Sequence, residues 1–164
     1  LSLHGLPKGG ESRPELQGTH SASHIYLPEL SGYWSAPTPS NVSSPKIKLS
    51  LHPIGGFCTI SNKLPPTHTC AEYVTAKADS NGLNPHFGET IHCLAAEPHE
   101  TIVRISVIQS SEDGVDEEVA FETAILARLR PGYRVLQLRN LLGTRIKLCY
   151  LFVNILFGEV SIKG

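Results

Sequence analysis

Histidine and cysteine side chains are the groups in this sequence that could bind a transition metal or act as nucleophile and base. The candidates are His52, Cys58, His68, Cys70, His86, His92 and His99. A structural zinc site needs several convergent ligands, which usually come in two closely spaced pairs. His68 and Cys70 form one such pair on an expected strand, where residues i and i+2 point to the same side, but no second pair accompanies it. The spacing therefore favours hydrogen-bonded or surface histidines over a zinc site.

Catalytic signatures are also missing from the sequence. A hydrolase needs a nucleophile or a base that is oriented by a partner, and no G-x-S-x-G, Cys/His or paired-carboxylate pattern occurs. The glycine pairs Gly9-Gly10 and Gly55-Gly56 lack the strand-to-helix context of a phosphate-binding loop. We interpret this chain as non-catalytic and expect no cofactor of its own.

Charged residues are segregated along the chain, although the net charge is only -1. Residues 89–122 contain nine acidic residues and one basic residue, whereas residues 128–147 contain six basic residues and no acidic one. Two interpretations remain open: solvated strand-and-loop regions, or a local surface that binds anionic lipid headgroups. The candidates for such a surface are Lys46, Lys48, Arg134, Arg139, Arg145 and Lys147. The arginines could equally pair with acidic loop residues.

Strands must position these side chains, because period-two alternation dominates the chain. In residues 46–52, Ile47, Leu49 and Leu51 share one face, and the other face is polar and partly basic. The other predicted strands are residues 68–78, 90–95, 101–108, 118–126, 134–138 and 148–156, with a short rung near Phe57 and Ile60 and a helical turn within 124–129. Turn signals between them predict an all-β, eight-stranded antiparallel β-sandwich in a single domain, residues 1–164.

Residues 9–44 are rich in Gly, Ser, Pro and His and show no sustained period, so they are interpreted as a long loop or insertion. Their apolar residues include Ile25-Tyr26-Leu27, Leu30, Tyr33 and Trp34. This apolar island could dock on the sheet as a lid, insert into a lipid interface or bind a partner. Tyr33 and Trp34 are the candidate partner-binding residues.

The segment Asn81-Gly82-Leu83-Asn84-Pro85-His86-Phe87-Gly88-Glu89 predicts a tight turn that feeds the following strand. It resembles the "N-G-x-N-P-x-W/F-x-E" turn of C2 domains, most closely those of phosphoinositide-specific phospholipases C. Ser44-Pro45-Lys46-Ile47-Lys48-Leu49-Ser50-Leu51-His52, Ile102-Val103-Arg104-Ile105-Ser106-Val107 and Leu129-Arg130-Pro131-Gly132-Tyr133-Arg134 also resemble family motifs, in the right order. Residues 136–141 and 151–154 look most like the epsilon-type domain.

The resemblance implies a C2-like sandwich of type II topology. Residues 1–8 match the end of the family's first strand, so that strand is expected to be truncated or to begin upstream. It also allows a check of the calcium site, because Ca²⁺ prefers several carboxylate ligands. The family's aspartate positions fall on Ser44, Gln109 and Ser111. Glu112, Asp113 and Asp116 lie nearby, and whether they rebuild a site stays open. We expect no metal here.

The resemblance further implies a parent phospholipase C that cleaves phosphatidylinositol 4,5-bisphosphate, with Ca²⁺ only in its separate catalytic barrel. This domain would then scaffold the barrel, orient it at the membrane without calcium, and be cytoplasmic and peripheral to the membrane. Signalling proteins are further possible partners, and nucleic acid is not expected. The alternative is a stand-alone C2-like protein-interaction module. No run of the sequence is long and apolar enough for a membrane span, and the four scattered cysteines are interpreted as reduced thiols.

Overall fold

The computed structural model describes residues 19–27, 44–64, 66, 68–78 and 85–161, with the backbone alone at 19–27 and 159–161. In these residues the chain forms nine strands and one 3-10 turn. They are β1 (Thr19–Leu27), β2 (Pro45–Pro53), β3 (Cys58–Ser61), β4 (Glu72–Val74), β5 (Glu89–Ala95), β6 (Thr101–Ser110), β7 (Asp116–Ile125), η1 (Leu126–Arg128), β8 (Gly132–Arg139) and β9 (Arg145–Ser161).

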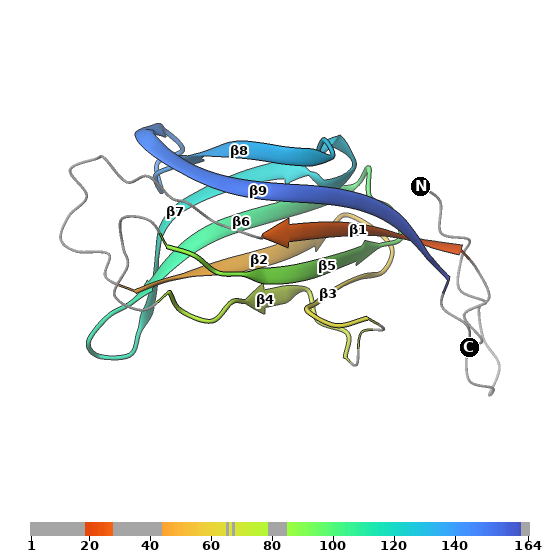
Figure 1. The fold of residues 1–164 in the computed structure, drawn as a ribbon, viewed down its shortest axis with the longest axis horizontal. Helices are drawn as coiled ribbons and strands as arrows, with labels where there is room; N and C mark the ends of the chain where they lie inside the picture. The colour runs from red at the N-terminus through yellow and green to blue at the C-terminus, as the bar shows by residue number, and fades with distance from the viewer. Residues whose placement is uncertain (1–18, 28–43, 65, 67, 79–84, 162–164) are drawn as a thin grey trace.

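The strands form two packed layers, which confirms the predicted antiparallel sandwich. Neighbouring strands follow the order β3-β5-β1-β9-β8-β7-β6-β2-β4, and the sheet folds over between β7 and β8, whose register contains the single pair Phe121–Arg139. Figure 1 shows β9, β1 and β5 in front of β6 and β2. Buried side chains from both layers belong to one core cluster, so the two layers share a hydrophobic interior.

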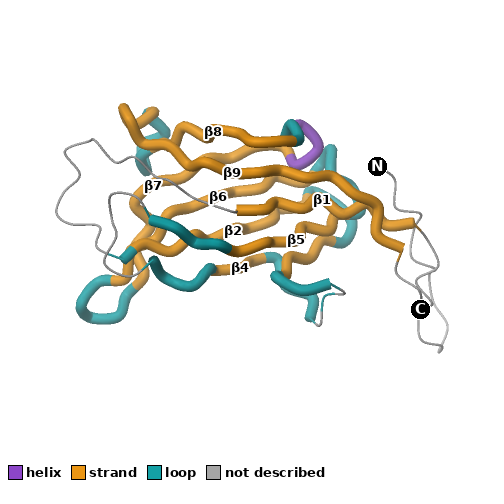
Figure 2. The backbone as a smooth tube through the Cα atoms, in the orientation of Figure 1, coloured by secondary structure: helices purple, strands orange, loops and turns teal. Residues whose placement is uncertain are grey.

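The alternation predicted for residues 46–52 explains how β2 divides its side chains between core and solvent. Ile47, Leu49 and Leu51 are almost fully buried, while Lys46 and Lys48 are partly exposed. We call the surface that carries these lysines the outer face of the β4-β2-β6-β7 layer. Loops and turns gather at the two ends of the strands (Figure 2).

Two sequence-based interpretations are wrong in detail. The sequence predicts a loop or insertion at residues 9–44, yet residues 19–27 form β1, which pairs with β5 on one side and β9 on the other. Hydrogen bonds from two neighbours stabilise this strand, although its sequence shows no clear period. Within residues 68–78, only β4 pairs as a strand, because the flanking segments make irregular contacts such as Ile60 N to Cys70 O (2.7 Å). Residues 1–8 lie outside the described part of the chain.

Candidate functional site

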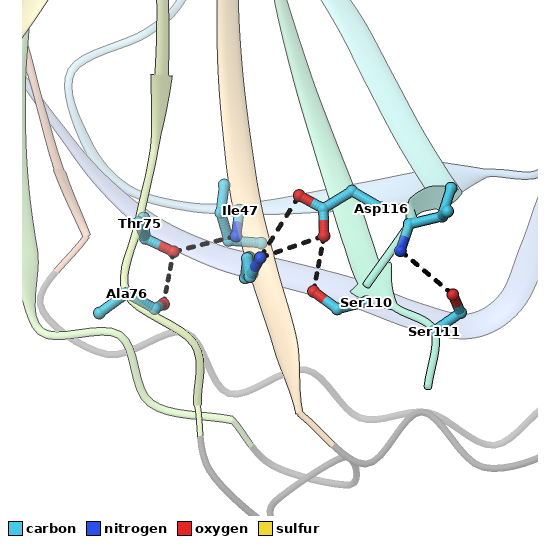
Figure 3. Close-up of polar contacts among 8 residues, drawn as sticks. Ile47, Thr75, Ala76, Ser110, Ser111 and Asp116 are labelled. Atoms are coloured by element: carbon cyan, nitrogen blue, oxygen red, sulfur yellow. Dashed lines mark hydrogen bonds and ion pairs between the residues drawn. The ribbon is translucent and has the colours of Figure 1, made fainter. Parts of the chain in front are cut away.

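Three segments meet at one end of the sandwich, which we call the loop end, and a fourth lies apart from them at the same end. The three are the start of β2, residues 75–78 and the β6–β7 loop at 111–115, and the separate one is the β8–β9 turn at 140–144 (Figure 1). Backbone bonds hold residues 75–78 against β2: Thr75 N donates to Ile47 O and Ala78 N donates to Pro45 O, each at 2.9 Å. The Ile47 amide in turn donates to Thr75 Oγ1 at 3.0 Å (Figure 3). Three hydrogen bonds therefore hold residues 75–78 to the start of β2.

Asp116 is an acidic residue at the loop end whose carboxylate has hydrogen-bond partners from two strands. Its carboxylate accepts hydrogen bonds from Ser110 Oγ at 2.6 Å and from Lys46 Nζ at 3.1 and 3.3 Å (Figure 3). The Ser110 hydrogen bond, followed by Lys46, lowers the pKa of Asp116 from its ordinary value. The carboxylate is thus charged and already satisfied by a protein cation.

The other candidate metal residues are spread around Asp116. Ser44 directly precedes β2, Gln109 lies on β6 opposite Pro45, and Ser111 is in the β6–β7 loop. Glu112 and Asp113 are exposed in the same loop. Within the described residues, no three His, Cys, Asp or Glu side chains group closely enough to hold a metal ion.

The six candidate cations belong to two different layers. Lys46 and Lys48 project from β2, whereas Arg134, Arg139, Arg145 and Lys147 belong to β8 and β9. Lys48 pairs with Glu72 at 2.9 Å, and Arg139 Nε pairs with Glu122 at 3.2 Å. The six cations are therefore distributed over two surfaces.

The remaining cations differ in how their charge is engaged. The Arg134 guanidinium folds back on its own turn and donates to Pro131 O at 2.6 Å and Arg130 O at 3.3 Å. Arg145 contacts the Gln137 amide oxygen at 3.5 Å. Lys147 is exposed, and no described carboxylate forms an ion pair with it or with Arg145.

Opposite charges alternate across the outer face of the β4-β2-β6-β7 layer. The Lys48 ammonium, as the leading cause, lowers the pKa of Glu72. Arg104 Nε donates to Glu118 Oε2 at 3.3 Å, and the same guanidinium lies 3.7 Å from the ring centroid of Phe121. This outer face is consequently a mixed, largely ion-paired surface.

The turn motif that carried the family resemblance contributes an anchor that sequence reasoning did not identify. Its last residue, Glu89, accepts hydrogen bonds from Tyr73 Oη at 2.6 Å and from the Ala76 amide at 2.7 Å. Phe87 packs against the core, and Gly88 adopts φ 61°, a left-handed conformation that favours glycine. Residues 81–84 lie outside the described part of the chain. Glu89 thus ties the segment after β4 to the start of β5.

The β8–β9 turn was also missed as a candidate site. Asn140 Oδ1 accepts hydrogen bonds from the amides of Leu142 (3.1 Å) and Thr144 (2.9 Å), and Gly143 adopts φ 82°. The side chains of Leu141 and Leu142 are 60% and 90% exposed. An Asn-x-x-Gly turn that contains two leucines was the sequence signal that could have revealed it.

The outer surface of β8 and β9 carries an apolar patch. Tyr133 and Val135 are 60% and 61% exposed, and the Tyr133 ring stacks on Phe152 at 5.4 Å between centroids. The candidate partner residues Tyr33 and Trp34 lie outside the described residues. In the part of the chain that is described, no helix is long and apolar enough to span a bilayer.

Comparison with known proteins finds curated relatives over part of the chain. No family model matches the chain. Over 95 residues the sequence is 34% identical to "Inactive phospholipase C-like protein 1" of Rattus norvegicus and to the Mus musculus protein of the same description. The matched stretch is 58% of this chain, and the chain spans only 9% of the length of these relatives.

Solved structures show the fold. The L. pealei PLC21 crystal structure matches 89% of this chain with a TM-score of 0.63 and 18% identity, and the match covers 16% of that protein. A C2 domain of plant Extended Synaptotagmin 1 matches 89% of this chain over 100% of its own length, with a TM-score of 0.60 and 18% identity. The C2-like β-sandwich predicted from the sequence is therefore confirmed.

Proposed function

We propose that this chain is the non-catalytic C2 domain of a phospholipase C-related protein and that it holds its parent at anionic membranes without calcium. The identity to inactive phospholipase C-like protein 1 supports the relationship. Because that relative is named an inactive phospholipase C-like protein, the role proposed for this domain does not depend on hydrolysis by the parent. The epsilon-like subtype is part of the proposal and rests on the motifs at 136–141 and 151–154.

The observation that carries the calcium-independent role is the Lys46–Asp116 contact at the loop end. Ca²⁺ binds about six to eight oxygen atoms, several of them from carboxylates. Here the Asp116 carboxylate already accepts hydrogen bonds from Lys46 Nζ and Ser110 Oγ. The family's ligand positions are Ser44, Gln109 and Ser111, which provide no carboxylate. A calcium ion at Asp116 would have to displace the Lys46 ammonium, and within the described residues no group of three acidic, His or Cys side chains would hold it.

Headgroup binding would use the cations that face solvent. Each Lys or Arg near an anionic surface contributes about 1 kcal/mol, provided that its charge is not already compensated. Lys46, Lys48 and Arg139 have carboxylate partners, so they contribute less than Arg145 and Lys147. Within the parent, the domain would pack against the catalytic barrel, whose Ca²⁺ site belongs to that barrel. The proposed setting is the cytoplasmic face of a membrane, in phosphatidylinositol 4,5-bisphosphate signalling.

Liposome sedimentation tests the proposal. The purified chain is mixed with phosphatidylcholine vesicles with and without phosphatidylinositol 4,5-bisphosphate, in Ca²⁺ and in chelator. We expect binding that survives chelator and weakens with salt, because screening reduces headgroup attraction. Asp116→Asn is the calcium control and should leave the ratio of binding in Ca²⁺ to binding in chelator unchanged. Binding in Ca²⁺ alone would overturn the calcium-independent role, and no binding in either would overturn the membrane role.

The apolar patch of β8 and β9 favours a second candidate, a protein-interaction module. Tyr133 and Val135 are exposed and the Tyr133 ring stacks on Phe152, and an exposed apolar patch of this kind is typical of protein contact sites. Val135→Asp would weaken binding to a protein partner but leave vesicle binding unchanged. Vesicle binding separates the two candidates, because the membrane role requires it in both the wild type and Val135→Asp and the interaction module does not.

A further inference from the structure

The β8–β9 hairpin presents apolar side chains on a braced backbone. We call residues 139–149 the leucine hairpin, after three exposed leucines: Leu141, Leu142 and Leu148, which are 60%, 90% and 50% exposed. Gly143 N donates to Asn140 O and Asn140 N donates to Thr144 O, each at 2.9 Å. The Arg139 guanidinium adds a bond to Gly143 O at 3.0 Å. The leucines therefore face solvent because the turn is held in that form.

A bulge follows this turn on β9. The register passes from Gln137–Tyr150 to Arg139–Arg145, so residues 146–149 lie opposite a single residue of β8. Leu148 adopts φ 55°, an uncommon conformation for a leucine. Lys147 and Leu148 are exposed while Cys149 is buried. The bulge thus exposes a cation and a third leucine on β9, next to the turn.

Charge distinguishes this hairpin from the β6–β7 loop and from Ile54. Arg145 and Lys147 flank the leucines, and residues 128–147 contain no acidic residue. The β6–β7 loop at the same end carries exposed Glu112 and Asp113. At the opposite end, Ile54 is 79% exposed but lies beside Glu100, whose carbonyl accepts a bond from its amide at 3.0 Å. Of these exposed apolar sites, the leucine hairpin is the one flanked by cations.

We infer that the leucine hairpin inserts into the headgroup region of anionic bilayers, with Leu141, Leu142 and Leu148 below the surface and Arg145 and Lys147 at the phosphates. This inference deepens the proposed membrane role and rests on it. Apolar side chains with flanking cations are the combination that binds a bilayer interface. The braced turn reduces the ordering cost of insertion, because its backbone already has the required form. The acidic β6–β7 loop would be repelled, so the hairpin leads the approach.

Vesicle partitioning of single variants tests the inference. The vesicles contain phosphatidylcholine and phosphatidylserine. We expect Leu142→Ala to weaken partitioning by up to about fiftyfold, since it removes three inserted carbon atoms. Lys147→Gln should weaken it about fivefold and lower its salt dependence. Ile54→Ala is the matched apolar control and Lys63→Gln the matched charge control, because both lie on exposed positions away from the hairpin. Both controls should bind as the wild type does.

A depth measurement provides a second readout. In a Trp34→Phe background, the tryptophan introduced by Leu142→Trp is the reporter. On addition of vesicles its fluorescence should shift to the blue and be quenched by brominated lipid, whereas the tryptophan introduced by Ile54→Trp should show neither change. If the wild type binds vesicles but Leu142→Ala binds equally well and the new tryptophan stays unquenched, the inference is wrong and the membrane role stands. If the wild type itself fails to bind, both are wrong.

Discussion

Removal of the Tyr73 hydroxyl is expected to destabilise the fold by about 1–2 kcal/mol. The hydroxyl donates to Glu89 at 2.6 Å, and a hydrogen bond to a charged group contributes about 1.5–3 kcal/mol when well shielded. Tyr73 is only partly buried, which places the effect in the lower part of that range. In Tyr73→Phe the ring still packs against the core, and Glu89 keeps the Ala76 amide at 2.7 Å. Urea unfolding at neutral pH should show a lower midpoint with an unchanged slope.

The same variant predicts a change at alkaline pH. Burial, followed by the Glu89 hydrogen bond, raises the pKa of Tyr73 to about 12. Because the folded-state pKa is raised, the contribution to stability is complete below the ordinary pKa of about 10 and is lost as the pH rises through about 12. The difference corresponds to at most ~2.7 kcal/mol, and solvent at this partly exposed group reduces it. Tyr73→Phe should lack this alkaline loss.

Tyr133→Phe is the matched control, because Tyr133 is 60% exposed and its ring contact with Phe152 does not involve the hydroxyl. We expect it to change the free energy of unfolding by less than about 0.5 kcal/mol. Equal unfolding midpoints for the two variants at neutral pH would refute the anchoring role of the Tyr73–Glu89 bond.

Three further predictions concern the core, the outer face and the leucine hairpin. Leu126→Ala, at a fully buried position, should lower the unfolding free energy by about 2–5 kcal/mol in urea titrations. Burial raises the pKa of Glu118, but hydrogen bonds from Arg104 and Ser106 outweigh it and hold that pKa below 4.5. The stabilisation by the charged Glu118 is therefore present above pH 4.5 and is lost on acidification. The difference in unfolding free energy between the wild type and Glu118→Gln should thus become smaller at low pH, which unfolding curves recorded at several pH values would measure. Gly143→Ala should cost about 1–2 kcal/mol in thermal unfolding, because φ is 82° and no neighbouring atom offers a compensating contact within 4 Å.

The predictable part of the fold was the part governed by side-chain period. The alternation of Ile47, Leu49 and Leu51 identified β2 and its buried face, and β-branched runs located β6 and β7 to within a few residues. The strand at 19–27 could not be found this way, since its place depends on backbone bonds to β5 and β9. Backbone hydrogen bonds can be formed by every residue except proline, so they do not produce a recognisable pattern in the sequence.

The site was less predictable, because ion pairing depends on register. Lys46 and Lys48 were correctly expected on a solvent-facing side, but the sequence does not say that Asp116 and Glu72 lie within reach of them. Asp116 lies close to Lys46 because it is the first residue of β7 and pairs with Ser110, the last residue of β6. The end of β6 in turn pairs with the start of β2. Leu141 and Leu142 would have been assigned to the core by composition alone, and their exposure follows from the Asn140 turn.

The position of β1 has a consequence for how the chain folds during synthesis. β1 lies between β5 and β9, with Thr19 opposite Ser161 and Leu27 opposite Glu89. A ribosome therefore releases β1 long before β9 can pair with it. The layer of β2, β4, β6 and β7 can assemble from shorter-range pairings first, while β1 waits as an open edge. Contacts that join distant segments are slow to form, and an unpaired edge strand invites association with other chains. Chaperone demand during translation should thus be concentrated on the nascent chain before β9 emerges.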